Sequence, residues 1–232
     1  MYGGYYYGGI DSSWFTLLII ALMVSFYAQF KVSSSFSKYL KVPSSSNYTG
    51  SQIARIILDR NGLYDVEVEP IGGNLTDHYD PRRRVVRLSR NVYNGNSIAS
   101  VSVAAHEVGH ALQHAEGYLP LLLRNNIAPI VSFGSRFIWI LVILGFVVSP
   151  FYLELGIALY LGIVLFQVIT LPVEFNASRR ALYQLENGLV YQDEIQSSKK
   201  VLSAAALTYV AATLVSFAEL LRLLALAGRR RD

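Results

Sequence analysis

Apolar residues gather along the chain into four long blocks, which are separated by stretches of mixed polarity. The blocks run from Trp14 to Phe30, at 127–148, from Phe151 to Leu171, and from Val201 to Gly228. A helix of about 20 mostly apolar residues can cross a bilayer core of about 30 Å. We therefore expect a mostly α-helical integral membrane protein with about four membrane helices, at 14–30, 127–148, 151–171 and 201–228.

The stretch at 31–126 has the pattern of a small soluble α+β portion. It begins with a Ser-rich polar connector, "SSSFSKYLKVPSSSN". Thr49 and Gln52 then stand at capping-box spacing, which predicts a helix in "TGSQIARIILDRNG". "DVEVEP" alternates like a strand, and a second strand is expected around 84–88, after a turn at Asp80-Pro81. So short a portion buries only a modest core, so we expect it to pack on the membrane helices.

A second helix is predicted from Ile98 to about Ala115, with Ser97 as its N-cap and Gly117 as its stop. Residues 172–200 are expected to form a further helix and a connector, and residues 1–13 are a Gly/Tyr-rich segment of low complexity.

Composition and charge agree with a membrane location. The chain is 53% hydrophobic and 16% charged, against about 25% charged in ordinary soluble domains. Lys and Arg concentrate at 31–124 and 179–200, which lie on one side if the second and third blocks form a hairpin at Ser149-Pro150. The positive-inside rule makes that side cytoplasmic, in a multi-pass protein of the cell membrane. The terminal "RRRD" opposes this if the fourth block spans fully, so full and partial insertion both stay open.

The chain has no cysteine, which excludes disulfides and thiolate metal ligands. The net charge of +4 suits loops that face anionic lipid. No aromatic-basic pattern typical of nucleic-acid binding is present. The expected partners are the lipid bilayer and a protein or peptide substrate; the oligomeric state stays open.

His106, Glu107 and His110 form an H-E-x-x-H motif in the second predicted helix. Residues i and i+4 share a helix face, so both imidazoles can bind one cation while the glutamate stands beside it. Zinc lowers the pKa of its bound water from about 15.7 to about 7, and a carboxylate can take the proton as that water attacks a carbonyl. The alternative is a helix whose histidines merely satisfy polar groups near the membrane surface. The apolar and small residues around the motif favour the metal, because buried polar groups need partners.

A catalytic zinc usually has three protein ligands. His114 lies about 80° around the helix from His106 and about 12 Å along it, which is too far for a shared metal. Glu174 is the best candidate for the third ligand. Its helix face carries Ala177, Ser178 and Ala181, small residues that allow close approach of another helix, for example at Gly109. The alternative for Glu174 is an interfacial charge at the end of a membrane helix.

Four motifs in order, "GNLTDHYDP", "SVAAHEVGHALQH", "TLPVEFNASRRAL" and "KKVLSAAALTYVAA", resemble those of the YugP-type neutral zinc metallopeptidases, a bacterial membrane protease family. The likeness spans about 31–224, and more distantly the layout is similar to HtpX-type membrane peptidases and CAAX prenyl endopeptidases. The resemblance implies one zinc per chain bound by His106, His110 and Glu174, with Glu107 as general base. The distant relatives tend to have an aspartate four residues after the ligand glutamate, where this chain has Ser178.

Asp77, His78 and Asp80 lie in a motif without a mechanism of its own. One hypothesis makes His78 or Tyr79 a donor to the developing oxyanion. The alternative is a polar turn stabilised at Asp80-Pro81.

Together these features predict a membrane-embedded, gluzincin-like zinc metalloprotease with a zincin-like α+β portion. It would hydrolyse peptide bonds of membrane-associated proteins by attack of a zinc-bound water assisted by Glu107. The alternatives are a zinc hydrolase of another amide or ester, and a metal-stabilised membrane scaffold or adaptor without peptidase activity.

Overall fold

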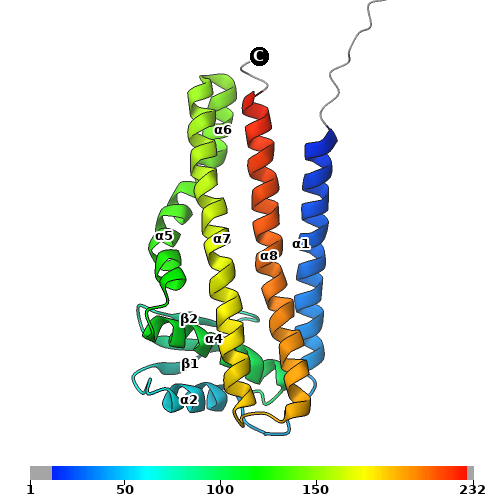
Figure 1. The fold of residues 1–232 in the computed structure, drawn as a ribbon, viewed down its shortest axis with the longest axis vertical. Coiled ribbons are helices and arrows are strands. Elements are labelled where there is room, and N and C mark those ends of the chain that lie inside the picture. Colours follow the sequence, from blue (N-terminus) through cyan, green and yellow to red (C-terminus); the bar gives the residue numbers. More distant parts are fainter. Residues whose placement is uncertain (1–11, 229–232) are drawn as a thin grey trace, which may run out of the picture.

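The computed structural model describes residues 12–228 and consists mainly of long helices (Figure 1). In chain order the elements are α1 (Ser12–Tyr39), α2 (Gly50–Arg60), β1 (Glu67–Ile71), β2 (His78–Asp80), β3 (Val85–Ser89), α3 (Arg90–Tyr93), α4 (Ile98–Ala115), α5 (Leu119–Ser135), α6 (Ile138–Val147), α7 (Pro150–Glu186) and α8 (Gln192–Gly228). Most of the Gly/Tyr-rich start and the terminal arginine run, on which two sequence predictions rest, lie outside the described residues.

The three longest helices, α1, α7 and α8, run side by side with α8 in the middle (Figure 1). Each has a stretch long and apolar enough to cross a membrane, within Thr16–Tyr39, Pro150–Glu186 and Gln192–Gly228. Helices α5 and α6 pass the same test together as one span that is bent by 41°. The prediction of a mostly helical chain with about four apolar helices is confirmed at this level.

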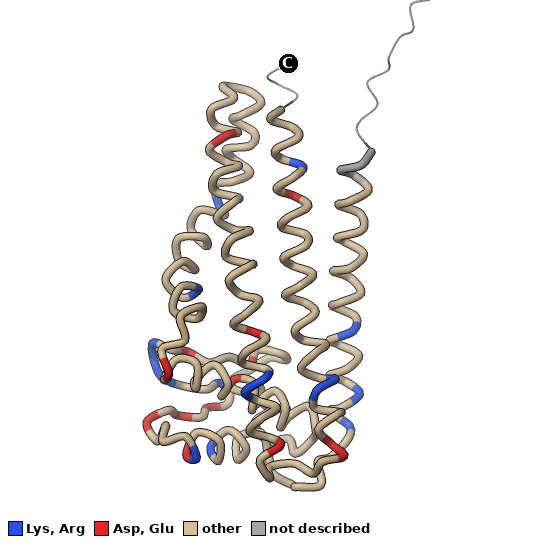
Figure 2. The backbone as a smooth tube through the Cα atoms, viewed as in Figure 1, with Lys and Arg blue, Asp and Glu red and all other residues tan. Residues whose placement is uncertain are grey.

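Charged residues are unevenly distributed over this bundle. Figure 2 shows most of them around the α/β portion and the adjoining ends of α1, α7 and α8, while the opposite parts of the helices carry few. A long, nearly uncharged length of helix is what a bilayer core requires. The turn between α6 and α7 lies at Ser149-Pro150, where the sequence predicts it, with the Ser149 hydroxyl accepting from the Phe151 N–H.

Helix α1 is longer than the sequence predicts. The Ser-rich stretch after Phe30 was expected to be a polar connector, yet the helix continues to Tyr39. The expectation fails because Phe36 and Tyr39 are buried in the main core, and this burial outweighs the weak helix propensity of serine. Lys31 and Lys38 therefore lie on the helix.

Helix α7 joins two predicted segments into one. The third apolar block was expected to end at Leu171, but α7 continues through Pro172 to Glu186. Proline removes one backbone hydrogen bond, and the buried residues Thr170, Val173 and Glu174 around it hold the helix together. Helix α8 likewise begins at Gln192, earlier than the predicted start of the fourth block.

The α/β portion lies at one end of the bundle (Figure 1). Its sheet has the order β1-β3-β2, with β1 parallel and β2 antiparallel to β3. Two strands were predicted, and β2 is a third, formed where only a turn was expected. The capping box of α2 is confirmed, since Thr49 and Gln52 bond reciprocally.

The core of this portion includes side chains from the long apolar helices α7 and α8. Buried residues of α2, β3 and α4 pack with Leu185 at the end of α7 and with Val201 and Leu202 of α8. The expected packing of the α/β portion on the long apolar helices is confirmed for α7 and α8. This packing fixes α4 against α7 and α8.

Candidate metal centre

Helix α4 carries the H-E-x-x-H motif inside the protein. It spans Ile98–Ala115 as predicted, with the Ser97 hydroxyl accepting from the Ser100 N–H as N-cap. The rings of His106 and His110 lie edge to face, with centroids 4.9 Å apart. The two imidazoles therefore share one face of the helix, as the spacing predicts.

Helix α7 brings Glu174 to this face because the two helices approach closely. A Cβ on Gly109 would lie 2.6 Å from the backbone oxygen of Ala177, closer than side-chain atoms can come. The expectation that Gly109 meets the small face of α7 is confirmed. A side chain at Gly109 would push Glu174 away from the histidines.

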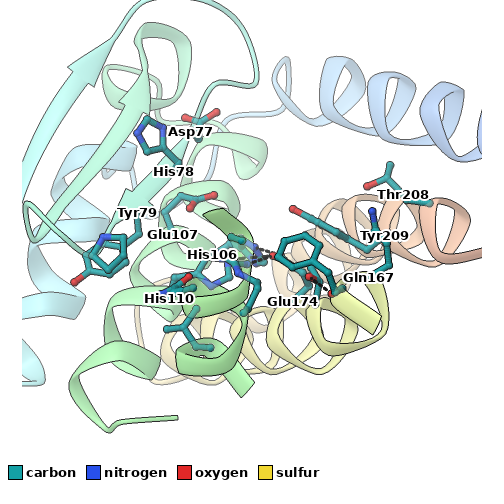
Figure 3. Close-up of a pocket in the computed structure, with 18 residues that line it drawn as sticks. Asp77, His78, Tyr79, His106, Glu107, His110, Gln167, Glu174, Thr208 and Tyr209 are labelled. Atoms are coloured by element: carbon teal, nitrogen blue, oxygen red, sulfur yellow. Dashed lines mark hydrogen bonds and ion pairs between the residues drawn. The ribbon is translucent and has the colours of Figure 1, made fainter. Parts of the chain in front are cut away.

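The three candidate ligands converge on one point (Figure 3). Glu174 Oε2 lies 3.2 Å from His106 Nε2 and 3.6 Å from His110 Nε2. Two atoms that bind zinc at about 2.0–2.1 Å with a tetrahedral angle are about 3.3 Å apart. Two imidazole nitrogens and one carboxylate oxygen are also a donor set that suits zinc. The residues present fit the metal in both spacing and chemistry.

The other nitrogen of each imidazole has a partner of its own. His106 Nδ1 lies 3.1 Å from Ser178 Oγ, and His110 Nδ1 lies 3.0 Å from Gln113 Oε1. With Nδ1 donating its hydrogen, the lone pair of Nε2 is directed at the shared point. Ser178, whose role the sequence left open, therefore lies where it can orient His106.

Gln113 and Arg124 support the site and were missed in the sequence. Gln113 is fully buried and donates to the Val173 carbonyl and to Asn176 Oδ1, which fixes its oxygen toward His110. Arg124 of α5 donates to Glu174 Oε1 over 2.9 Å, leaving Oε2 to face the histidines. No local signal in the sequence distinguishes either residue, because Gln113 stands beside His114 and Arg124 is followed by Asn125 and Asn126.

Glu107 is buried beside the convergent trio but is not part of it (Figure 3). Burial is the largest cause that raises its pKa, and the negative charges of Glu174 and Asp77 raise it further. His106 and the backbone N–H of Tyr79 act in the opposite direction, and the resulting pKa is about 7. A carboxyl group with this pKa can take up and release a proton near neutral pH.

The neighbouring motif residues have different positions. Asp77 accepts from the Ser89 N–H and hydroxyl, which ties β2 to the end of β3. Asp80 accepts from the backbone N–H groups of residues 82 and 83, so the expected turn is confirmed for this residue. His78 Nδ1 bonds to the Thr76 carbonyl, while its ring lines the cavity described below.

His114 lies away from the trio, as expected from the helix geometry. Its Nδ1 is 2.8 Å from the hydroxyl of Tyr79. The Tyr79 hydroxyl is therefore hydrogen-bonded to a residue outside the three convergent ligands.

A cavity of about 650 Å³ opens onto the trio. One wall is formed by β2 and α4, and the other by α5, α7 and α8 (Figure 3). The lining contributed by α5, α7 and α8 includes the polar residues Asn125, Gln167, Thr170, Thr208 and Tyr209. Tyr209 was not singled out in the sequence, because its place opposite the histidines depends on the packing of α8 against α7.

Comparison with known proteins gives the family of this chain. A family model described as "Putative neutral zinc metallopeptidase" matches residues 14–228. The chain belongs to this zinc metallopeptidase family. It is similar to a protein of Bacillus subtilis (strain 168) named "Putative membrane protease YugP", with 56% identity over 218 residues, 93% of this chain and 97% of the relative. No solved structure matches the chain. The resemblance to this family, first seen in four motifs, extends over nearly the whole sequence.

We expect Gln113→Leu to weaken zinc binding by about 10–100-fold, the usual cost of losing a hydrogen bond behind a metal-bound histidine. Leucine is similar in size but has no oxygen to hold His110 Nδ1. Zinc affinity would be measured by competition with a chromogenic chelator. Gln113→Glu, which keeps an acceptor, should recover most of the affinity, and Gln196→Leu on the exposed face of α8 should leave it unchanged. Wild-type affinity in Gln113→Leu would contradict the role given to this residue.

Proposed function

We propose that this member of the zinc metallopeptidase family is a membrane-embedded protease that hydrolyses peptide bonds of membrane-associated proteins. The observation that carries the proposal is the convergence of His106, His110 and Glu174 on one point, with Glu107 buried beside them and outside that group. A site kept only for structure does not need the extra carboxylate.

His106 Nε2, His110 Nε2 and Glu174 Oε2 would hold one zinc ion per chain. Zinc, when bound, supplies a Lewis acid that polarises the scissile carbonyl and acidifies a water molecule. Arg124 holds the Glu174 carboxylate in a fixed orientation through the 2.9 Å contact to Oε1. Ser178 and Gln113 hold the imidazole rings.

Glu107 is the proposed general base. Its carboxylate would accept a proton from the attacking water and pass it to the amide nitrogen of the leaving peptide. Water and a peptide bond thereby become a carboxylic acid and an amine, and Glu107 returns to its starting state. The burial that raises its pKa to about 7 suits a group that must both accept and donate.

Charge that develops on the carbonyl oxygen requires a donor in the cavity. The phenol of Tyr209 lies on the opposite wall from the histidine helix and is one candidate (Figure 3). His78 remains the second: its Nδ1–H donates to the Thr76 carbonyl, so Nε2 can donate to an oxyanion only when the ring carries both protons. The hydroxyl of Tyr79 bonds to His114, which favours the other two.

The position of the cavity supports membrane-associated substrates. Its far wall belongs to α7 and α8 and to the bent pair that begins with α5, all of which qualify as candidate spans. A peptide near the level where these helices enter the bilayer can reach the site. The concentration of Lys and Arg around the α/β portion supports a cytoplasmic location of the site in the cell membrane (Figure 2).

The test is metal-dependent proteolysis by the purified full-length chain in detergent. We expect slow cleavage of an unfolded reporter such as casein, loss of cleavage when a chelator removes the metal, and recovery with about one equivalent of zinc but not of magnesium. Peptide-mapped products would show which bonds are cut. Hydrolysis of small esters without any peptide cleavage would favour the alternative of a zinc hydrolase that acts on a non-peptide amide or ester. One bound zinc per chain with no hydrolysis of any reporter would favour the alternative of a metal-stabilised membrane scaffold without peptidase activity.

A further inference from the structure

A groove lies between α1 and α8, apart from the candidate metal centre. Its volume is about 650 Å³. The lining residues are Lys31, Ser34, Ser35, Lys38 and Tyr39 of α1 and Lys200, Ser203, Ala204 and Leu207 of α8. None of them lines the cavity of the metal centre.

The groove is strongly positive. Lys31, Lys38 and Lys200 contribute three ammonium groups, and no carboxylate is among the lining residues. Within residues 12–228, none of these three lysines forms an ion pair with an acidic side chain; Lys38 lies over the ring of Tyr39, 5.3 Å from its centroid. An arrangement of unpaired cations along a concave surface attracts an anion.

Hydroxyl groups accompany the cations. Lys31 and Lys38 are seven residues apart, two turns or about 10.5 Å along one face of α1. Ser34 and Ser35 lie between them, and Ser203 lies on the facing helix one turn beyond Lys200. Ammonium and hydroxyl donors directed at one volume are the donors that a phosphate accepts from.

The groove lies where both helices pass from the polar to the apolar part of the protein. On α1 it begins just after the exposed apolar residues Met23, Phe26, Tyr27 and Phe30. On α8 it begins at Lys200 and ends at the apolar pair Ala204 and Leu207. Figure 2 shows the basic residues of α1 and α8 side by side at this level, below the nearly uncharged lengths. A phosphate here would have an apolar surface directly beside it for attached acyl chains.

We propose that this groove binds the phosphate of an anionic phospholipid head group, with the acyl chains lying along the exposed apolar face of α1. Basic pockets between helices at the membrane surface bind such head groups. A free phosphate would use the same donors but not the adjoining apolar surface. The bound lipid would join α1, which packs mainly on α8, to the rest of the bundle.

The test is lipid retention by the full-length protein in uncharged detergent, measured by native mass spectrometry as phosphatidylglycerol is added. We expect one tightly retained phosphatidylglycerol per chain, and much weaker retention of phosphatidylcholine with the same acyl chains. The triple variant Lys31→Gln/Lys38→Gln/Lys200→Gln should bind phosphatidylglycerol about 100-fold more weakly, since each of the three lysines near an anionic head group contributes roughly fivefold.

The matched control removes the same charge outside the groove. Lys41→Gln/Arg82→Gln/Arg83→Gln changes three exposed cations and should retain phosphatidylglycerol within about twofold of the wild type, by the same charge argument. If the triple variant is poorly folded by circular dichroism, the double variant Lys31→Gln/Lys38→Gln replaces it and leaves α8 intact.

Three results would overturn the proposal. Wild-type retention by the groove variants would show that the lysines do not bind the lipid. Equal retention of phosphatidylcholine would show an apolar site without charge recognition. Displacement of phosphatidylglycerol by inorganic phosphate at similar concentration would assign the groove to a free anion.

Discussion

Replacing Glu107 with glutamine is expected to lower the rate of peptide hydrolysis by about 10²–10⁴-fold, the usual contribution of a general base, while about one zinc per chain is retained. Glutamine keeps the size and the acceptor for the Tyr79 N–H but cannot take up a proton. The three proposed ligands are other residues, so the metal should stay. Metal content by mass spectrometry and the rate of casein cleavage, measured on the same preparation, check both parts.

Glu116→Gln is the matched control, because Glu116 ends the same helix and pairs with Arg180 at the surface. Exposed ion pairs contribute little, so this variant should keep wild-type activity and metal. Full proteolytic activity in Glu107→Gln would mean that another group transfers the proton. Full biological activity without any proteolysis would favour the metal-stabilised scaffold. Loss of zinc in Glu107→Gln would instead give Glu107 a part in holding the metal.

The dependence of activity on pH adds a second readout. Burial raises the pKa of Glu107 to about 7, so the share of its reactive carboxylate form falls as the pH falls. A bound cation draws this pKa down again, which places the acid limb of the wild-type profile at or below about pH 7. The residual activity of Glu107→Gln should lack that limb.

Local patterns in the sequence were sufficient to predict the helices that carry the candidate site. The capping box at Thr49, the N-cap at Ser97 and the i, i+4 histidines each depend on residues within one or two turns, and all three have the predicted geometry. The approach of Gly109 to α7 was also foreseeable, since both surfaces consist of small residues.

What the sequence did not reveal depends on partners distant in the chain. The serines after Phe30 are helical because Phe36 and Tyr39 reach a core built by α2, α4 and α8. Strand β2 exists because β3 lies beside it. Gln113, Arg124 and Tyr209 gain their places from α7, α5 and α8 packing around α4, which no local pattern encodes.

Glu174→Ala is expected to weaken zinc binding by more than about 100-fold, beyond the cost of losing a hydrogen bond behind a ligand, and to bring peptide hydrolysis below detection. Two imidazoles alone leave the ion held only by α4, whereas Glu174 Oε2 lies 3.2 and 3.6 Å from their Nε2 atoms and joins α7 to the site. Zinc would be measured by metal content after dialysis and by competition with a chelator. Glu186→Ala, at the exposed end of the same helix, should bind zinc like the wild type.

Loss of the Glu174 carboxylate also leaves Arg124 without its partner, so a second variant must separate metal binding from folding. Glu174→Gln keeps an oxygen for Arg124 and nearly the same volume, yet a neutral amide is a much weaker zinc ligand than a carboxylate. A protein with wild-type thermal unfolding but without zinc would attribute the loss to the ligand itself. Retention of zinc in both Glu174 variants would mean that the third ligand is another group. The 3.2 Å contact between His106 and Glu174 would then be an ion pair that positions α7 against α4, and the search for the third ligand would turn to Asp77 and His78 on the opposite wall of the cavity.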